Sequence, residues 1–445
     1  MEQQVFRARL IEKLADSLHG PVTGGTRRRL FRRPSLTGKA TAVIGMRRAG
    51  KTTYLHQLRQ DWLSQGWGRA RIPYLNFEDE RLAGVPASML HVLIDEFYRR
   101  HPELRLRESV AWCFDEIQVV SGWERFVRRI LDEENVVVYL SGSSAALLSR
   151  EIATAMRGRA WEIVLYPFSF LEFLDHHQQA VPEDPTFLSA VQRSALERQF
   201  LDYLEVGGFP EAQGLDLGTR ARLLTDYVDV ATFRDVAERH AVSNLAGLRW
   251  LVRHLLGNAG GSFSVEKFHR SLKSQGFSIS RDTVHQLLSY LEDCFLVRTV
   301  WVEATSDRQR MVHPRKAYPI DTGLIPVFDR SGKANLGHAL ETAVLLELER
   351  RGKSLTYVKT AEGHEVDFLA RGPDGEAELI QVCADPTGPV LERELRFLAG
   401  AGPMKGRKVR RRLLTLTADA IPESVPGGVI AQPAYEWMLE EAPKF

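Results

Sequence analysis

The sequence contains little cysteine and no long hydrophobic run. Its three cysteines, Cys113, Cys294 and Cys383, lie far apart in apolar surroundings and lack the spacing of a metal site. Free cysteines of this kind are typical of a reducing compartment. No segment approaches the roughly 20 apolar residues that a membrane-spanning helix needs, and residues 1–10 are polar and charged, unlike a signal peptide. We therefore expect a cytoplasmic protein without membrane contact.

The chain also has little excess charge of either sign. Its 59 basic and 57 acidic residues leave a formal charge of +2, which excludes no partner and indicates none. The basic residues are nevertheless clustered, and each cluster could contact a phosphate backbone or could form a solvated face. The first cluster contains Arg27, Arg28, Arg29, Arg32 and Arg33, and the second contains Lys405, Arg407, Lys408, Arg410, Arg411 and Arg412.

The run Gly-Met-Arg-Arg-Ala-Gly-Lys-Thr-Thr at 45–53 fits the phosphate-binding pattern G-x-x-x-x-G-K-[ST]. A short apolar strand at 42–44 precedes it and a helix pattern follows, which is the context that the motif requires. Lys51 can reach the β- and γ-phosphates of ATP, and Thr52 can ligate Mg²⁺. Glycine permits the backbone shapes that point the N–H groups of the loop at phosphate. The predicted nucleotide-binding residues are Gly45, Arg48, Ala49, Gly50, Lys51, Thr52 and Thr53.

A pair of carboxylates follows a second apolar run. Residues 110–114 predict a buried strand that ends in Asp115 and Glu116. Beside a phosphate loop, Asp115 would share the Mg²⁺ with Thr52, and Glu116 would polarise the attacking water. The alternative is that the two acids cap a helix. A further strand candidate at 72–77 separates the two motifs.

A third apolar strand, at 136–140, ends in a serine-rich segment. Ser143 is our first candidate for reading the γ-phosphate and Ser144 the second, although the segment could simply cap a helix. Arg157 and Arg159 follow, and either could act as a finger on the nucleotide of a neighbouring subunit, because arginine is permanently charged and binds phosphate in a forked geometry. A solvated surface pair is the alternative.

Residues 262–302 predict a helix capped by Ser264, a turn, a helix capped by Ser280 and two strands. This order resembles a winged helix, whose DNA-binding version places the second helix in the major groove. The alternative is a winged helix that serves only protein packing. Together with the first basic cluster, the predicted DNA contacts are Arg27, Arg28, Arg29, Arg281 and Gln286, with Arg308 and Arg310 at a hairpin tip.

The C-terminal third resembles the PD-(D/E)xK nuclease fold. Glu341 lies on a predicted helix and Asp367 on a strand, and a hairpin leads to another strand. That fold needs an acidic residue and a lysine on the last strand, where this chain has Gln381 and Cys383. Glu378 cannot substitute, because it is three residues from Gln381 and faces the other side of the strand. We therefore expect no nuclease activity.

Taken together, these segments resemble the bacterial and archaeal AAA-superfamily ATPases that carry a degenerate nuclease-like domain. The resemblance rests on the phosphate loop, Asp115-Glu116-Ile117-Gln118 and Asp321-Thr322-Gly323-Leu324. It implies an α/β protein with a P-loop ATPase core on a parallel sheet. The expected order is an N-terminal helix and basic segment (1–38), the ATPase core (39–175), a helical region (176–260), a winged helix (261–330) and a smaller nuclease-like α/β domain (335–445).

The resemblance further implies a function that uses ATP and Mg²⁺. We expect an ATP-hydrolysing homo-oligomer, with a hexamer as one candidate form, that acts on DNA as a ring translocase or a branch-migration-like motor. The alternative is a nucleotide-gated signalling or assembly switch with slow hydrolysis. A phosphoryl-transfer enzyme ranks last, because no acceptor site is evident.

Overall fold

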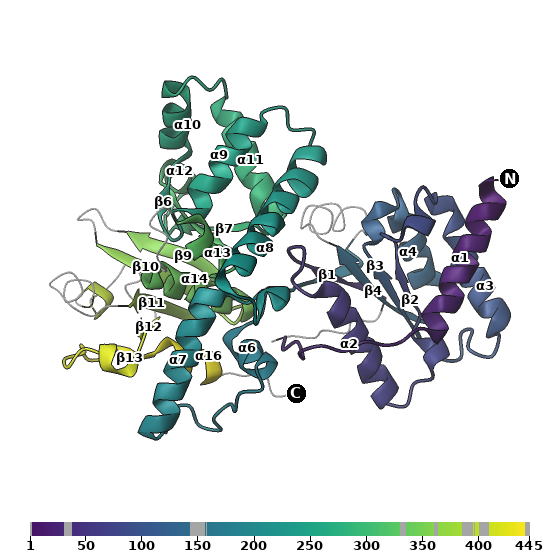
Figure 1. The fold of residues 1–445 in the computed structure, drawn as a ribbon, viewed down its shortest axis with the longest axis horizontal. Helices are drawn as coiled ribbons and strands as arrows, with labels where there is room; N and C mark the ends of the chain where they lie inside the picture. The colour runs from purple at the N-terminus through teal and green to yellow at the C-terminus, as the bar shows by residue number, and fades with distance from the viewer. Residues whose placement is uncertain are drawn as a thin grey trace. The chain divides into compact units, whose positions relative to one another are not determined.

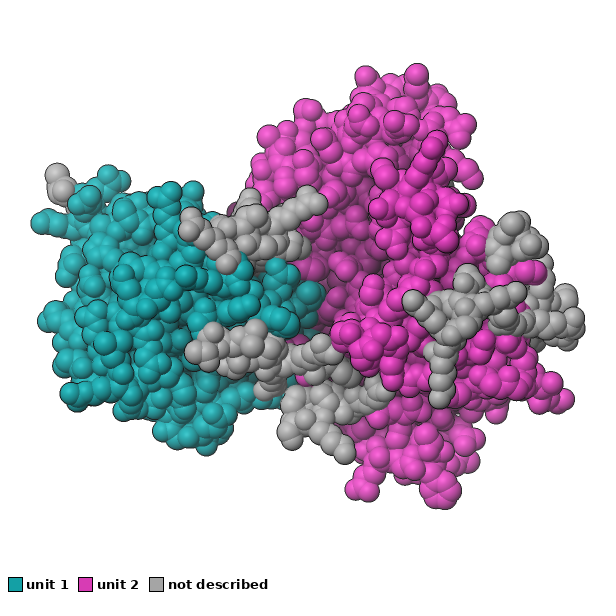
Figure 2. All heavy atoms as spheres, turned by 180° about the vertical axis from the view of Figure 1, so that it is seen from behind, with its two compact units in different colours: residues 1–28, 32–165 teal, residues 29–31, 166–445 magenta. Residues whose placement is uncertain are grey.

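The computed structural model describes residues 2–30, 38–142, 156, 158–329, 335–359, 364–384, 395, 397–399 and 409–440. The chain forms two compact units, coloured separately in Figure 2. The first unit holds residues 1–28 and 32–165, and the second holds residues 29–31 and 166–445. The first unit thus ends about ten residues before the predicted end of the ATPase core. In the part of the chain that the structure describes, no helix has both the length and the apolar character to cross a membrane.

The described part of the first unit contains a parallel five-stranded sheet in the order β2-β3-β4-β1-β5. The strands of a parallel sheet are covered on both faces, so their sequences are continuous apolar runs. β3 follows this rule and is buried at every position. Right-handed crossovers then place α2 on one face and α4 on the other, as Figure 1 shows. The strands are β1 (Ala40–Ile44), β2 (Tyr74–Asn76), β3 (Val110–Asp115), β4 (Val136–Gly142) and β5 (Ala160–Val164).

The helices of the first unit close the two faces of this sheet. Leu10 and Leu14 form the buried stripe of α1, which packs on α3 and β2. The helices are α1 (Glu2–His19), α2 (Lys51–Ser64), α3 (His91–Arg100) and α4 (Trp123–Glu133), with short 3-10 turns at Arg69–Arg71, Glu80–Leu82, Ala87–Met89 and Ile117–Val119.

The second unit begins with helices whose starts are set by polar caps. The hydroxyls of Ser169 and Ser189 each accept a hydrogen bond from the backbone N–H of the third helix residue, and that residue's side chain accepts one from the serine N–H. These contacts satisfy two backbone N–H groups that would otherwise lack a partner. Asp216 caps the next helix. The elements are α6 (Phe170–His176), α7 (Ala190–Val206), a 3-10 turn (Pro210–Ala212), α8 (Leu217–Val230), a π-helical segment (Ala231–Glu238) and α9 (Leu245–Leu256).

An eight-stranded sheet runs through the rest of the described second unit, in the order β13-β12-β11-β10-β9-β7-β8-β6. β7 pairs antiparallel with β8 and parallel with β9. The predicted winged-helix and nuclease-like regions therefore share one sheet instead of forming separate ones. The strands are β6 (Ser262–Phe263), β7 (Val297–Val302), β8 (Arg315–Pro319), β9 (Ser354–Lys359), β10 (Glu365–Arg371), β11 (Ala377–Cys383), β12 (Val409–Thr415) and β13 (Ile430–Pro433).

The predicted hairpin tip is helical. Arg308 and Arg310 lie on α12, which joins the antiparallel strands β7 and β8. The hydroxyl of Ser306 accepts a hydrogen bond from the N–H of Gln309, so this connection starts a helix instead of a tight turn. The remaining elements are α10 (Val265–Ser274), α11 (Arg281–Asp293), α12 (Asp307–Val312), α13 (Leu324–Phe328), α14 (Leu336–Arg350), a 3-10 turn (Ala418–Ala420) and α16 (Ala434–Glu440).

Candidate nucleotide-binding site

The loop between β1 and α2 requires both of its motif glycines. Gly45 has a φ of 150°, and a Cβ there would lie 2.2 Å from the carbonyl oxygen of Leu165. Gly50 has a φ of 93° and is the left-handed residue from which α2 starts. Arg48 is exposed and also has a positive φ, 67°. The loop has the compact backbone that phosphate-binding loops use to gather N–H groups.

Lys51 lies at the start of α2 and turns its side chain back over the loop. Its Nζ donates hydrogen bonds to the carbonyl oxygens of Gly45 and Met46, both at 3.1 Å. The residue is 6% exposed. The ammonium is therefore held directly over the concave backbone, where a phosphate group would meet it.

The carboxylate of Asp115, at the end of β3, is oriented from three directions. Its Oδ2 accepts hydrogen bonds from Thr52 Oγ1 and from Tyr74 Oη, each at 2.7 Å. Its Oδ1 accepts one from Ser141 Oγ on β4. Asp115 is fully buried. These contacts arise because the carboxyl ends of parallel strands meet at one edge of the sheet.

Glu116 follows in a left-handed conformation with a φ of 51°, which is uncommon for a residue with a side chain and clusters at functional sites. Its N–H donates to Ser141 Oγ at 3.1 Å, and its carboxylate accepts a hydrogen bond from Gln118 Nε2. Burial raises the pKa of Glu116, the nearby Asp115 raises it further, and Lys51 opposes the shift. A carboxylate with a raised pKa is suited to accept a proton at neutral pH.

The structure brings together Gly45, Lys51, Thr52, Asp115 and Glu116, all of which the sequence pointed to. It adds three residues for which we predicted no role: Tyr74, Ser141 and Gln118. Only their positions in the sequence could have indicated a role. Tyr74 lies on the strand between the two motifs, and Ser141 is two residues before Ser143, the serine that we selected. Ser143, Ser144 and Arg157 lie outside the described residues. The other predicted loop residues, Ala49 and Thr53, lie directly before Gly50 and directly after Thr52.

The donor set fits a magnesium nucleotide. Loop N–H groups, a lysine ammonium, a threonine hydroxyl and an aspartate are the groups that phosphoryl-transfer sites of this type use. Two of the backbone positions are ones that a Cβ would strain or block. Among the described residues, no group of three or more His, Cys, Asp or Glu side chains could hold a metal ion by itself. In sites of this kind Mg²⁺ is bound by one or two protein groups together with substrate phosphates and waters.

The predicted arginine finger and the N-terminal arginines have intramolecular partners. Arg159 is half-buried, with a side chain 40% exposed, and pairs with Asp132. Arg27 pairs with Asp61 at 2.6 Å, and Arg29 pairs with Asp175 at 2.6 Å. Arg28 is only 2% exposed and donates to the carbonyl oxygen of Ala49. Its burial contradicts the prediction that Arg28 contacts DNA, because a phosphate backbone cannot reach a buried guanidinium.

The other predicted DNA contacts are accessible. Arg281 and Gln286 are exposed on α11, and Arg281 lies 3.9 Å from Glu266 in a loose ion pair. Arg308 is exposed on α12 and Arg310 is half-buried.

The nuclease-like region contains a cation that the sequence did not predict. Lys316, on β8, extends its Nζ to within 2.9 Å of Glu341, 2.8 Å of Glu365 and 2.9 Å of Asp367. The position that we compared with the lysine of the last strand is Cys383 in this chain, and Lys316 supplies a cation to these carboxylates from a different strand, β8. Glu378 pairs instead with Arg412, at 2.8 Å.

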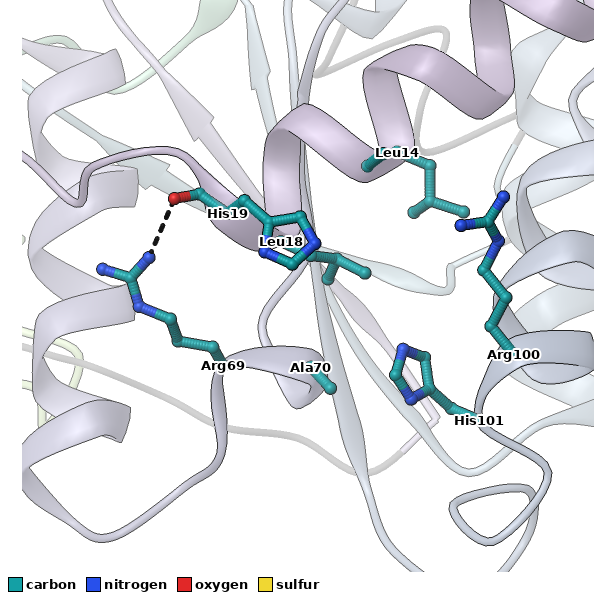
Figure 3. A pocket seen from close by; sticks show the side chains of 8 residues that line it. Leu14, Leu18, His19, Arg69, Ala70, Arg100 and His101 are labelled. Carbon is teal, nitrogen blue, oxygen red and sulfur yellow. Dashed lines mark hydrogen bonds between the residues drawn. The ribbon is translucent and has the colours of Figure 1, made fainter.

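A cavity of about 450 Å³ lies elsewhere in the first unit. It opens between the end of α1, the 3-10 turn at Arg69–Arg71 and the end of α3 (Figure 3). Leu14 and Leu18 line it, and Arg69 is fixed beside it by a hydrogen bond to the carbonyl oxygen of His19. No residue of the phosphate loop lines this cavity.

Comparisons with known proteins agree with this geometry. A family model described as "AAA domain" matches residues 37–174, and one described as "Domain of unknown function (DUF8612)" matches residues 197–333. "Uncharacterized protein MJ1544" of Methanocaldococcus jannaschii is 33% identical over 366 residues, which is 81% of this chain and 78% of that protein. An "Uncharacterized protein" of Haemophilus influenzae is 31% identical over 342 residues, 77% of this chain and 81% of that protein.

Two solved structures are similar at lower identity. The Walker-type ATPase PABY2304 of Pyrococcus abyssi is 16% identical with a TM-score of 0.39, and the match covers 72% of this chain and 95% of that chain. The Aeropyrum pernix ORC1 protein in complex with DNA is 17% identical with a TM-score of 0.28, and the match covers 73% and 91%.

Proposed function

Because this chain belongs to the AAA superfamily of P-loop ATPases, in one family with the relatives from M. jannaschii and H. influenzae, we propose that it hydrolyses ATP with Mg²⁺ as a homo-oligomer that acts on DNA. One observation carries the ATPase part of the proposal. A lysine and a threonine hydroxyl at the start of α2 and two carboxylates at the end of β3 converge on one glycine-rich loop.

Each of these residues has a defined task in the proposal. The N–H groups of the loop and the ammonium of Lys51 hold the β- and γ-phosphates. Thr52 and Asp115 hold the Mg²⁺, which neutralises phosphate charge when it is bound. Lys51 donates to two loop carbonyl oxygens, which a phosphate oxygen would have to replace when ATP binds. The exchange is favourable because a charged phosphate oxygen accepts a stronger hydrogen bond than a carbonyl oxygen does.

Glu116 is the residue that accepts the proton of the attacking water. Its raised pKa makes it a better base at neutral pH than an ordinary glutamate. Gln118 donates to one carboxylate oxygen and Ser141 accepts from the Glu116 N–H, so the side chain and the backbone are both fixed. This leaves the second carboxylate oxygen to hold the water.

The DNA part of the proposal depends on residues 262–319. The strands β6, β8 and β7 form an antiparallel sheet, and α10 and α11 pack on each other. We interpret this arrangement as a winged helix in which α11 is the DNA-reading helix. Arg281 in its first turn and Gln286 in its second are exposed, and these positions reach base edges in helices that enter the major groove.

The oligomeric part of the proposal depends on arginine. Arg159 is the described finger candidate, and its surface ion pair with Asp132 breaks easily, because solvent screens the attraction between such charges. In a ring, such an arginine could reach the nucleotide of a neighbouring copy. A hexameric translocase or branch-migration-like motor is the form we propose.

The deciding experiment measures ATP hydrolysis with and without duplex, single-stranded and branched DNA, together with the mass of the assembly with and without nucleotide. Lys51→Ala serves as the inactive reference. We expect DNA to stimulate hydrolysis and nucleotide to increase the assembled mass. Assembly with slow hydrolysis that DNA does not change would favour the nucleotide-gated switch instead.

If DNA is bound, its affinity should fall with salt, with a slope near −0.9 in log K against log salt for each neutralised phosphate. Replacing Arg281 and Gln286 with alanine should weaken binding and flatten this slope by about one unit, because one charge is removed. Replacing Arg28 should leave the slope unchanged, because this side chain is buried.

A further inference from the structure

Residues 24–28 lie along α2, the helix that starts at the phosphate loop. Gly24 and Gly25 approach α2 closely: a Cβ at Gly24 would lie 2.9 Å from the side chain of Gln60, and one at Gly25 would lie 3.0 Å from that of Thr53. Both glycines therefore allow backbone-to-helix contact that a side chain would hinder. The segment runs antiparallel to α2, from Gln60 towards Gly50.

One side chain of α2 fastens this segment. Gln57 is 2% exposed. Its Oε1 accepts a hydrogen bond from the Arg28 N–H at 3.0 Å, and its Nε2 donates to the carbonyl oxygens of Thr26 at 2.8 Å and Gly25 at 3.3 Å. All of the polar groups of the glutamine amide except one lone pair are thus used to hold Gly25, Thr26 and Arg28.

The consequence is a buried guanidinium against the phosphate loop. Arg28 Nη1 donates to the carbonyl oxygen of Ala49 at 2.6 Å. The same nitrogen would lie 3.2 Å from a Cβ at Gly50, so Arg28 packs on the face of the loop that this glycine leaves open. We call residues 24–28 the strap.

The hydrogen bond from Arg28 fixes the direction of a phosphate-binding N–H. In a trans peptide the C=O of one residue and the N–H of the next point in opposite directions, and no described peptide bond is cis. When Arg28 holds the C=O of Ala49, the N–H of Gly50 must point away from Arg28. That N–H belongs to the group that a phosphate loop directs at its anion.

We propose that Arg28 is a positioning residue of the nucleotide site, which acts through the Ala49–Gly50 peptide to pre-orient the loop for the phosphates of ATP. This inference rests on the proposed nucleotide binding. This role explains why position 28 is an arginine. A charged donor makes a stronger hydrogen bond to a carbonyl oxygen than a neutral donor does, and the guanidinium adds positive potential beside the phosphate site.

The test uses the full-length chain and a fluorescent N-methylanthraniloyl-ATP with Mg²⁺. Arg28→Met removes the donors and keeps the aliphatic stem, and Arg28→Lys restores a charged donor. We expect Arg28→Met to weaken nucleotide binding by roughly 10- to 100-fold, as expected for the loss of a hydrogen bond to a charged group, and Arg28→Lys to recover part of that loss.

A positioning role also predicts that Arg28→Met changes KM for ATP and leaves kcat almost unchanged. KM for ATP should rise with the dissociation constant, while kcat at saturating ATP should stay within about threefold of the wild type, since ground-state and transition-state binding are weakened alike. Gln57→Leu should weaken binding in the same direction although it removes no charge. It also keeps the test decisive if Arg28→Met does not fold. Arg125→Met, at an exposed position on α4, should bind as the wild type does.

Folded Arg28→Met or Gln57→Leu protein that binds within about twofold of the wild type would overturn the inference. So would an equal loss in Arg125→Met, because the effect would then not be specific to the strap. A wild-type chain that fails to bind the nucleotide would be a different result, since it would overturn the proposed nucleotide site itself.

Discussion

The hydroxyl of Tyr74 donates a hydrogen bond to Oδ2 of Asp115 at 2.7 Å. The two residues lie on neighbouring parallel strands, β2 and β3, and the same carboxylate oxygen accepts from Thr52. The position of Tyr74 beside a predicted Mg²⁺ residue gives the extra strand between the two motifs a role in the site.

Tyr74→Phe should raise the Mg²⁺ concentration that gives half-maximal ATP hydrolysis, by roughly tenfold. Groups that orient a metal-binding carboxylate affect metal affinity by about this amount. A Mg²⁺ titration of the ATPase rate at saturating ATP measures it. Tyr98→Phe is the matched control, because the Tyr98 hydroxyl is buried and has no hydrogen-bond partner among the described residues. An unchanged Mg²⁺ dependence in Tyr74→Phe would show that this hydrogen bond does not support the metal.

Glu116→Gln should bind ATP with nearly wild-type affinity and lose hydrolysis by roughly 10²- to 10⁴-fold, the range for removal of a general base. The amide keeps the shape of the side chain but cannot accept the proton. A filter-binding assay and a steady-state phosphate assay measure the two quantities separately. A Glu116→Gln variant that hydrolyses ATP at the wild-type rate would assign the base to another residue.

Arg159→Ala should leave ATP affinity almost unchanged and depress hydrolysis if the arginine acts on a neighbouring subunit. Arginine fingers contribute on the order of 10³-fold or more to phosphoryl transfer. Mixing Arg159→Ala with Glu116→Gln subunits should restore part of the rate, because some interfaces then combine an intact arginine with an intact base. Mixed assemblies of confirmed mass that show no recovery would argue against a finger in trans.

Lys316→Met should strongly destabilise the second unit. Removing the ammonium leaves Glu341, Glu365 and Asp367 facing one another, and breaking a buried ion pair costs about 3–5 kcal/mol. Thermal unfolding measures the loss, with Lys359→Met as the control, because the side chain of Lys359 is 46% exposed. If Lys359→Met lowers the melting temperature as much as Lys316→Met, burial of the ammonium is not the cause.

The same cluster bears on the predicted lack of nuclease activity. A divalent cation would have to displace a buried, ion-paired ammonium from the carboxylates. We therefore still expect no DNA cleavage with Mg²⁺ or Mn²⁺, for this reason in addition to the neutral Gln381 and Cys383 on the last strand of the comparison. Metal-dependent cleavage that is lost in Asp367→Ala but retained in Lys51→Ala would contradict this prediction.

Asp321 should make folding stability depend on pH. Burial raises its pKa to about 6, although hydrogen bonds from the Gly208 and Gly323 N–H groups and the charge of Arg350 favour the ionised form. The folded state then keeps the proton to a higher pH than the unfolded state, so the contribution of Asp321 to stability is full below about pH 4 and is lost as pH rises through about 6. The loss is on the order of 3 kcal/mol.

Urea unfolding between pH 4 and 7 tests this prediction against Asp321→Asn, whose side chain does not titrate. As pH rises, the unfolding free energy of the wild type should fall relative to that of Asp321→Asn. Asp229→Asn is the control, because Asp229 is exposed. A difference that does not change with pH would show that Asp321 titrates alike in the folded and unfolded chains.

The sequence by itself determined the nucleotide site wherever the site is made of neighbours along the chain. The loop from Gly45 to Thr53 is such a segment, since its glycines, lysine and threonine act through local backbone geometry. Asp115 and Glu116 were also predictable, because a parallel strand is a continuous apolar run and its carboxyl end marks the functional edge of the sheet. The helices capped by Ser264 and Ser280 and the strands β10 and β11 followed from the same local patterns, whereas β12 and β13 were not predicted.

Only the tertiary structure decided which distant residues complete these segments. Tyr74 reaches Asp115 across 41 residues, Arg28 reaches Ala49 across 21, and Lys316 reaches Asp367 across 51. In the sequence Arg28 looks like one more surface arginine, and Lys316 is an unremarkable residue of another strand. Local patterns fix the period of a helix or strand, whereas the partner of a long side chain depends on which elements become neighbours when their apolar faces are buried together.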